Sequence, residues 1–217
     1  MARIIIGLYI LLSLANITAD IIPSEELERY TKPLLMPMLL FYVYRQSIGK
    51  TTGRILLLCA ALLFSWFGDV ALMYQSSDMY FILGIGLFLT AQMFYIFVLR
   101  RSVFQKPEIS LISIVPFLAY AGLLFYTLLP AGDFTIPIII YGIVIMIMAI
   151  SAFSRKNQTT NESFKLAFWG SVLFVLSDSI LAINAFKIAI PFAGVLIMST
   201  YCAAQLLLVQ GILKHVE

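Results

Sequence analysis

Eight long apolar runs dominate this chain and constrain its fold more than any other feature. A helix needs about 20 apolar residues to cross a hydrocarbon core of about 30 Å. Backbone groups in lipid must pair within their own segment, and the runs lack the polar–apolar alternation of barrel strands. We therefore predict an all-α integral membrane protein of about eight transmembrane helices. The predicted spans are 4–20, 31–46, 53–74, 78–99, 109–129, 135–153, 164–186 and 188–213.

The composition agrees with this prediction, because 62% of the 217 residues are hydrophobic and only 12% are charged. Soluble domains are nearer half apolar and a quarter charged. The spans leave no room for a soluble domain, so we expect a single transmembrane domain over 1–217. The loops are short, so successive helices should form antiparallel hairpins. Residues 4–17 resemble a signal peptide, but the stretch that follows lacks an A-x-A pattern, so we interpret them as the first span.

Several classes of site are excluded by what the chain lacks. Cys59 and Cys202 lie inside apolar runs and are interpreted as core residues rather than as a disulfide or metal site. The single histidine, His215, lies near the end of the chain, so we expect no metal site and no cofactor. The nucleotide-binding motif G-x-G-x-x-G and the P-loop are missing, as are the G-x-S-x-G nucleophile elbow and the H-E-x-x-H metal motif. The basic residues are spread over short loops, so we expect no nucleic-acid partner.

The distribution of Lys and Arg predicts the orientation in the membrane. Eleven of the fourteen lie on one side of the predicted spans and three on the other. The positive-inside rule then places both termini in the cytoplasm. From the compactness of the chain we expect a bacterial inner membrane. The eleven are Arg3, Arg45, Lys50, Arg54, Arg100, Arg101, Lys106, Arg155, Lys156, Lys165 and Lys214, and the three are Arg29, Lys32 and Lys187.

A weak internal repeat relates the two halves of the chain. Gly68-Asp69-Val-Ala-Leu72 resembles Ser177-Asp178-Ser-Ile-Leu181, and Ala91-Gln92 resembles Ala204-Gln205. Each pair is separated by four spans, which is an even number. The possible halves, 1–106 and 107–217, would therefore be parallel repeats about an axis along the membrane normal.

Two aspartates, Asp69 and Asp178, lie within predicted spans and are the candidate catalytic residues. Asp69 follows Arg54 by 15 residues and Asp178 follows Lys165 by 13, so both carboxyls should lie at nearly the same depth. A charged Asp at the centre of a span costs about 2.5–3.5 kcal/mol on insertion scales, so such residues are functional by default. The alternative is a purely structural role, called a polar staple below, in which each protonated carboxyl hydrogen-bonds a neighbouring helix.

Lys32 opens the second predicted span, whose apolar part, 33–44, is only 12 residues long. Such a helix would extend about 18 Å, so we expect one end to sink and to draw Lys32 toward the depth of Asp69. The alternative is that its side chain reaches back to the head groups, or that the membrane thins.

Other polar residues share helical faces in the later spans. Phe88, Gln92 and Tyr95 share one helical face, and Tyr201 and Gln205 share another. They are either contacts between helices or ligands for a substrate. Asn184, six residues beyond Asp178, could cap its helix or contact a head group. The candidate substrate-binding residues are Lys32, Gln92, Tyr95, Asn184, Tyr201 and Gln205.

Taken together, these motifs resemble the YhhN family of membrane lysoplasmalogenases. The resemblance rests on Lys32-Pro-Leu, Gly68-Asp69-x-x-Leu, Phe88-x-x-x-Gln92-x-x-Tyr95, Ser177-Asp178-x-x-Leu-Ala-x-Asn184 and Tyr201-x-x-Ala-Gln205, in order over nearly the whole chain. It implies hydrolysis of the vinyl-ether bond of lysoplasmalogens to a fatty aldehyde and a glycerophospho-head group. The partners would be a lysophospholipid substrate and membrane lipid. The family often carries His where this chain has Gln92, so no titrating imidazole is implied there.

The implied reaction fits a pair of buried carboxyls. Vinyl ethers hydrolyse in acid: a proton adds to the outer alkenyl carbon, and water traps the oxocarbenium ion. One carboxylic acid and one carboxylate divide this work, as in glycosidases. Burial and a like-charged neighbour let two carboxyls share one proton. The residues also leave open a proton-coupled small-molecule or lipid transporter using the same aspartates, and a non-catalytic lipid-binding or scaffold protein.

Overall fold

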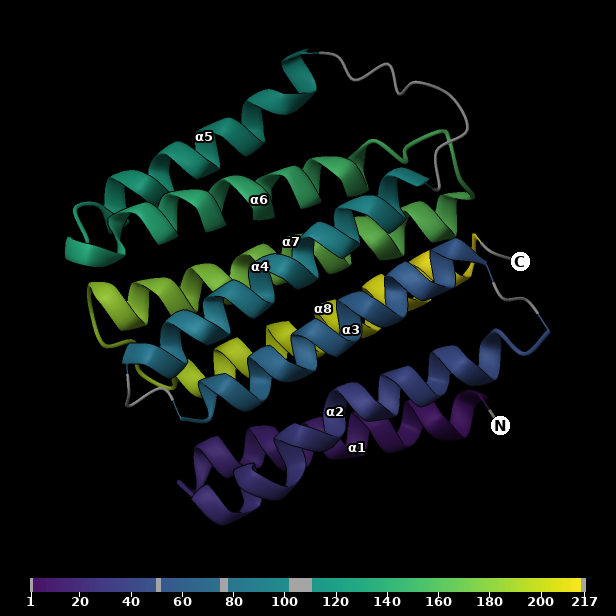
Figure 1. Cartoon of the computed structure of the whole chain (residues 1–217), viewed down its shortest axis with the longest axis horizontal. Helices are drawn as coiled ribbons and strands as arrows, with labels where there is room; N and C mark the ends of the chain where they lie inside the picture. The colour runs from purple at the N-terminus through teal and green to yellow at the C-terminus, as the bar shows by residue number, and fades with distance from the viewer. Residues whose placement is uncertain (1, 50–51, 75–77, 102–110, 216–217) are drawn as a thin grey trace.

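The computed structural model describes residues 2–49, 52–74, 78–101 and 111–215. Within these ranges the chain forms eight α-helices and a short 3₁₀ turn, with no strand, which confirms the predicted all-α class. The helices run along one another in one bundle, with both termini at the same end (Figure 1). The elements are α1 (Ala2–Ile21), α2 (Glu25–Gln46), α3 (Gly53–Leu72), α4 (Asp78–Arg101), α5 (Leu111–Leu128), η1 (Gly132–Phe134), α6 (Thr135–Phe153), α7 (Asn161–Phe186) and α8 (Ala193–Leu213).

Six of the eight helices begin and end within three residues of the predicted spans, and the two exceptions are α2 and α8. The predicted start of α8 at residue 188 is five residues too early. Pro191 and Phe192 stand in between, and Phe192 has a left-handed backbone (φ 56°), so the helix begins only at Ala193. Of the residues used in the charge count, Lys50 and Lys106 lie outside the described ranges, as do residues 75–77 of a predicted loop.

The predicted short span at 31–46 is wrong, because α2 begins at Glu25 and has 22 residues. The Ser24 hydroxyl accepts a hydrogen bond from the Leu27 N–H (3.3 Å), which caps the helix. Acidic residues in the first turn also favour the positive end of the helix dipole. At about 33 Å, α2 is long enough to match its neighbours. Helix length therefore gives no reason for Lys32 to be drawn inward.

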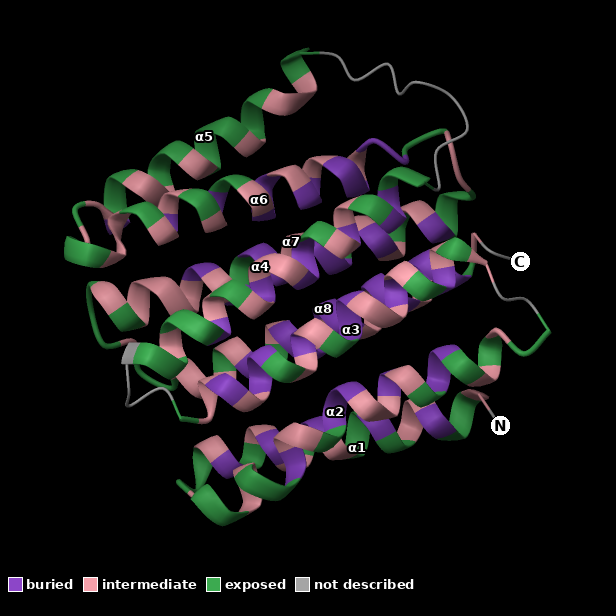
Figure 2. Cartoon of the chain, viewed as in Figure 1, coloured by how far each residue is buried: buried purple, intermediate pink, exposed green. Residues whose placement is uncertain are grey.

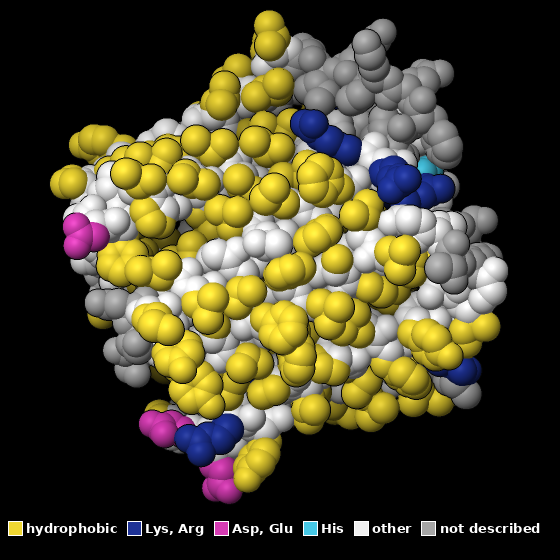
Figure 3. All heavy atoms as spheres, viewed as in Figure 1, with side chains coloured by type: hydrophobic (Ala, Val, Ile, Leu, Met, Phe, Trp, Pro, Cys, Tyr) yellow, Lys and Arg dark blue, Asp and Glu magenta, His cyan; other side chains and the backbone are white. Residues whose placement is uncertain are grey.

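The chain is a multi-pass integral membrane protein. Seven described helices, all except α2, are long and apolar enough to span a bilayer. Large hydrophobic side chains cover the face of the molecule in Figure 3, and the charged side chains gather toward its ends. An exterior of this kind requires a lipid surround, because soluble monomers rarely expose apolar patches beyond a few hundred Å².

Helices α3, α4, α7 and α8 form the centre of the bundle, with α1 and α2 on one side and α5 and α6 on the other (Figure 1). Glycines allow α7 and α8 to approach closely. A Cβ at Gly211 would lie 2.5 Å from the Ala167 nitrogen, and one at Gly170 would lie 2.8 Å from the Leu208 nitrogen. Small residues of this kind mark tight helix contacts in membranes.

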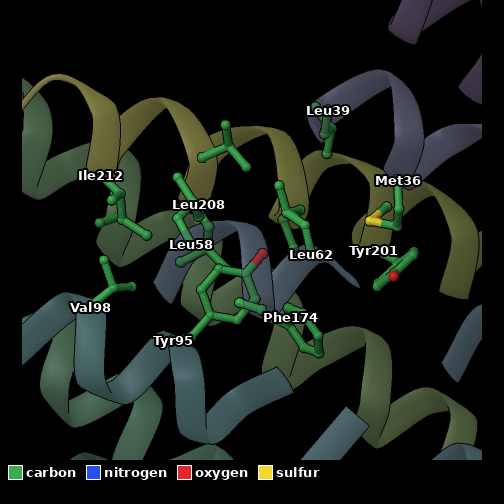
Figure 4. Close-up of a cluster of buried hydrophobic side chains, with 14 of the residues drawn as sticks. Met36, Leu39, Leu58, Leu62, Tyr95, Val98, Phe174, Tyr201, Leu208 and Ile212 are labelled. Atoms are coloured by element: carbon green, nitrogen blue, oxygen red, sulfur yellow. The ribbon is translucent and has the colours of Figure 1, made fainter. Parts of the chain in front are cut away.

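Burial follows this arrangement, as Figure 2 shows. Buried residues concentrate along the central helices, whereas α5 contributes only Leu128. Figure 4 shows the packed centre, in which the rings of Tyr95 and Phe174 lie among leucines of α3 and α8. The core is therefore continuous around the central four helices, and α5 is attached loosely to one edge.

Arg155, which follows α6, is fully buried. Its Nη2 donates hydrogen bonds to Ser163 Oγ (2.7 Å) and to the Gly211 carbonyl (3.3 Å), which ties the α6–α7 connection to the last turns of α8. Burial lowers the pKa of the Arg155 guanidinium to about 10, and the nearby Arg54 acts in the same direction. Arg155 thus remains charged at neutral pH. It holds the α6–α7 connection against α8 at the end of the bundle where both termini lie.

Candidate active site

Asp69 lies near the end of α3 and is only 3% exposed. Its Oδ2 accepts a hydrogen bond from the Tyr201 hydroxyl of α8 (2.9 Å). Gly68 allows α4 to come close at this level, because a Cβ there would lie 2.7 Å from the ring of Phe88. Phe88 of α4 and Tyr201 of α8 are both buried at this level.

Asp178 lies in the middle of α7 and has two neutral partners. Its Oδ2 accepts hydrogen bonds from the Tyr141 hydroxyl of α6 and from Gln92 Nε2 of α4 (3.2 Å). Gln92 Nε2 also donates to the Tyr141 oxygen (2.7 Å), so the three side chains form a closed triangle. Among the described residues, no hydrogen bond reaches Asp178 Oδ1. One carboxylate oxygen is therefore fixed and the other remains available.

The orientation of the Gln92 amide follows from this triangle. Its Nε2 faces a carboxylate and a phenol that itself donates, so the amide must present its N–H groups to them. The other end of the side chain, Oε1, is buried without a hydrogen-bond partner. Gln92 is thus held by Asp178 and Tyr141 and leaves one unsatisfied acceptor in the interior.

The two aspartates come from α3 and α7, and Tyr201, the hydrogen-bond partner of Asp69, packs on Phe174, one helical turn before Asp178. The rings of Phe88, Phe174 and Tyr201 pack edge to face around one another in this region, with centroids 5.7–6.4 Å apart. Figure 4 shows Phe174 and Tyr201 in this packing. The packing of the central helices thus brings the surroundings of the two carboxyls together, and their common depth stays a prediction.

Two interpretations of Lys32 were made from the sequence: a position near Asp69, and a side chain that reaches the head groups. The structure agrees with part of each. Its Nζ forms an ion pair with Glu28 Oε1 (2.9 Å) one turn earlier, and its side chain is 14% exposed. It is also near enough to Asp69 to act on that carboxyl electrostatically. The α2–α3 contact beside it is fixed by the Trp66 indole, which donates to the Pro33 carbonyl (2.8 Å). Lys32 therefore lies at the rim of the site, beside Asp69.

Tyr95 and Gln205 form a second buried network behind the aspartates. The Tyr95 hydroxyl donates to Gln205 Oε1 (2.5 Å), and Gln205 Nε2 donates to Ser65 Oγ (3.1 Å), which links α4, α8 and α3. Both side chains are fully buried. Neither makes a hydrogen bond to the Asp69 or Asp178 carboxyl, so the geometry favours contacts between helices over contact with a substrate.

Asn184 is not brought to the aspartates. Its Oδ1 accepts a hydrogen bond from the Ile190 N–H (2.8 Å), which braces the turn between α7 and α8. This matches the capping alternative. By contrast, the sequence interpretation missed Tyr141 and Ser65. Tyr141 had a signal, because its hydroxyl is the one polar group near the middle of a 19-residue helix that is otherwise almost wholly apolar.

A cavity lies beside Asp178, bounded mainly by α4, α5, α6 and α7. Asp178, Tyr141 and Ser179 supply its polar side chains, and all other lining residues are apolar. Asp69 does not line it. The two aspartates therefore differ in surroundings, because only Asp178 faces an open apolar space.

Metal ligands do not gather in the part of the chain that the structure describes. No group of three or more His, Cys, Asp or Glu side chains is placed to hold an ion there. Cys59 and Cys202 are both free thiols. What the site offers chemically is two carboxyls, two phenols, an amide and a nearby ammonium.

Comparison with known proteins gives consistent matches. The YhhN family model matches residues 27–212. Human lysoplasmalogenase TMEM86B is 30% identical over 194 residues, which cover 89% of this chain and 80% of that protein. The pig protein of the same name is 31% identical over 173 residues, 80% and 70% of the two chains. Human lysoplasmalogenase TMEM86A is 31% identical over 151 residues, 67% and 60%. No solved structure matches the chain.

Proposed function

The chain belongs to the YhhN family, and on this premise we propose that it is a lysoplasmalogenase that uses Asp69 and Asp178 as its catalytic pair. The observation that supports this most is the pair itself. Tyr201, which hydrogen-bonds Asp69, packs on Phe174 one turn before Asp178, and each of the two carboxyls is hydrogen-bonded by a phenol. The relatives named lysoplasmalogenase support the substrate class.

The reaction needs one acid and one base. The acid protonates the outer alkenyl carbon, and an electron pair on the ether oxygen moves to form an oxocarbenium ion. Water adds to the carbon next to that oxygen and gives its proton to the carboxylate. The resulting hemiacetal collapses to a fatty aldehyde and the free hydroxyl of the glycerophospho-head group. Two carboxyls that share a proton supply both roles.

The surroundings of the two aspartates suggest how the roles divide. Asp69 has the Lys32 ammonium nearby, and a cation stabilises a carboxylate. Asp178 has only neutral hydrogen-bond partners among the described residues, and its side chain lines the apolar cavity. We therefore assign the shared proton to Asp178, as the acid, and the negative charge to Asp69.

The direct test is turnover by the purified protein in detergent. We expect a lysoplasmalogen to yield equal amounts of fatty aldehyde and glycerophospho-head group. The matched control substrate has a saturated ether in place of the vinyl ether and should not react, because it has no alkenyl carbon to protonate. Absence of aldehyde from a folded, monodisperse sample would refute the proposal.

The second candidate function is a proton-coupled small-molecule or lipid transporter. It is favoured by the same two carboxyls, because membrane-buried acids are also used as proton relays. Transporter sites, however, are typically formed by discontinuous helices. Here α3 and α7 continue as α-helix on both sides of their aspartates. Proton-driven uptake into proteoliposomes without aldehyde release would favour the transporter.

A further inference from the structure

The cavity beside Asp178 has a shape that the proposed reaction does not by itself require. Its lining on α7 extends from Val175 to Phe186, a rise of about 16 Å. Asp178 lies near one end of this stretch. At the other end Phe81 and Phe186, both lining residues, pack with Phe134 of η1 at centroid distances of 5.2–5.9 Å. The cavity is thus elongated and apolar, with its carboxyl toward one end and an aromatic cluster at the other.

We propose that this cavity binds the hydrocarbon chain of a lysophospholipid, with the first carbons of the chain at Asp178 and the remainder toward Phe186. The ligand class rests on the proposed function, and the assignment of the cavity rests on its lining. An apolar chain fits a wall of aliphatic and phenyl side chains, whereas a charged head group would lose its hydration there without compensation. The head group must therefore lie on the other side of Asp178.

This placement gives the two aspartates different positions relative to the bound molecule. The bond that the proposed reaction breaks joins the chain to the head group, so it lies at Asp178, where apolar and polar surroundings meet. Asp69 does not line the cavity, and its helix α3 packs on α2 through the Trp66–Pro33 hydrogen bond. A chain in the cavity thus brings its alkenyl carbon to the free Oδ1 of Asp178.

Gly142 of α6 and Phe125 of α5 set the width of the cavity. Both line it, and a Cβ on Gly142 would lie only 2.6 Å from the Phe125 ring. Any side chain at Gly142 must displace that ring or occupy the cavity. Helix α5 packs on α6 and α7 and is otherwise little buried, so replacing Phe125 by Ala widens the cavity without opening the central core.

The experiment measures binding, not turnover. The probe is a series of saturated 1-alkyl lysophospholipids of increasing chain length, which cannot be hydrolysed by the proposed route. Binding is measured in lipid nanodiscs. A hydrocarbon chain that moves from the bilayer into the cavity exchanges one apolar medium for another. The preferred chain length therefore reports how well the chain fits the cavity, not how much apolar area it buries. We expect Gly142→Leu to shift the preference to shorter chains and Phe125→Ala to longer ones, by about tenfold in relative affinity.

The control variant is Gly122→Leu, on the exposed side of α5, where a Cβ meets nothing within 4 Å; it should leave the preference unchanged. A second measurement uses the unchanged protein. A saturated alkyl lysophospholipid with a diazirine in its chain should crosslink to α5 and α6 residues around Phe125 and Gly142. Crosslinks confined to other helices, or an unchanged length preference in folded Gly142→Leu and Phe125→Ala, would overturn the inference.

The two proposals fail separately. Crosslinks at Phe125 and Gly142 together with no aldehyde from a lysoplasmalogen would refute the reaction and keep the chain site. Aldehyde release together with crosslinks elsewhere would refute the chain site alone.

Discussion

Replacing each aspartate by asparagine separates catalysis from structure. In Asp178→Asn the amide oxygen can take the place of Oδ2 and accept the hydrogen bonds of Tyr141 and Gln92. The new NH₂ group then faces the position of Oδ1, where no described residue offers a partner. An unsatisfied donor costs about 1–3 kcal/mol. Asp178→Asn exchanges a neutral acid for a neutral amide, whereas Asp69→Asn removes a charge from a membrane span and so returns about 2.5–3.5 kcal/mol on insertion scales. The fold should therefore be retained.

Turnover should fall strongly in both variants even though the fold is retained. A placed general acid or base contributes about 10²–10⁴-fold, or about 2.7–5.4 kcal/mol at 1.36 kcal/mol per tenfold. Asp69→Asn should show a loss of similar size while its amide oxygen keeps the Tyr201 hydrogen bond. The double variant should be little worse than the poorer single one, because groups that act as a unit are not additive. Wild-type turnover should also fall at high pH, as the pair loses its shared proton.

The assay is aldehyde release at saturating lysoplasmalogen, together with a thermal melt in the same detergent. Asp133→Asn, on the exposed η1 turn, is the matched control and should behave as wild type in both. Folded Asp69→Asn and Asp178→Asn proteins that turn over at near wild-type rates would refute the catalytic pair and leave a structural staple. Loss of the melting transition in these variants would contradict the energetic argument above.

Three further predictions follow from the same geometry. Lys32→Met should weaken lysoplasmalogen binding more than it lowers saturated turnover if Lys32 holds the phosphate; an unchanged apparent KM and pH profile would leave only the interfacial role. Tyr141→Phe removes one donor to Asp178, worth about 0.5–1.5 kcal/mol for a neutral acceptor, and should lower turnover by about 2–13-fold with little change in KM. In a cysteine-free background, a cysteine at Asp133 should be labelled in intact cells and one at Asn157 only after permeabilisation; the reverse would overturn the predicted cytoplasmic termini.

The helices were predictable because lipid imposes one requirement on every residue in a span. Backbone groups must pair internally and side chains must be apolar, so hydropathy alone located most helix ends. The start of α2 was missed for the same reason. Its first turn is Glu25, Glu26 and Glu28, whose charges conceal a helix in a search for apolar residues, although the Ser24 cap was present in the sequence.

The sequence identified most residues of the site but not which of them form hydrogen bonds with one another. Helical spacing placed Gln92 and Tyr95 on one inward face, yet nothing in that spacing distinguishes the one that reaches Asp178 from the one that reaches Gln205. Those pairings depend on how α4 is rotated against α7 and α8, which is a property of tertiary packing. Tyr141 was missed because its partner is 37 residues away on another helix. The internal repeat, the membrane of residence and the orientation stay predictions.

The difference between the two aspartates is the feature that a catalytic pair most needs. Their sequence contexts are similar enough to predict a repeat, and two equivalent carboxyls would share a proton without preference for either. The surrounding helices make them unequal: α2 brings an ammonium toward Asp69, whereas α4 and α6 surround Asp178 with neutral donors and leave one of its oxygens beside an apolar cavity. Environments that separate the charge states of two neighbouring carboxyls assign one as acid and the other as base. A staple needs no such asymmetry, because two carboxyls that only join helices serve equally well in identical surroundings.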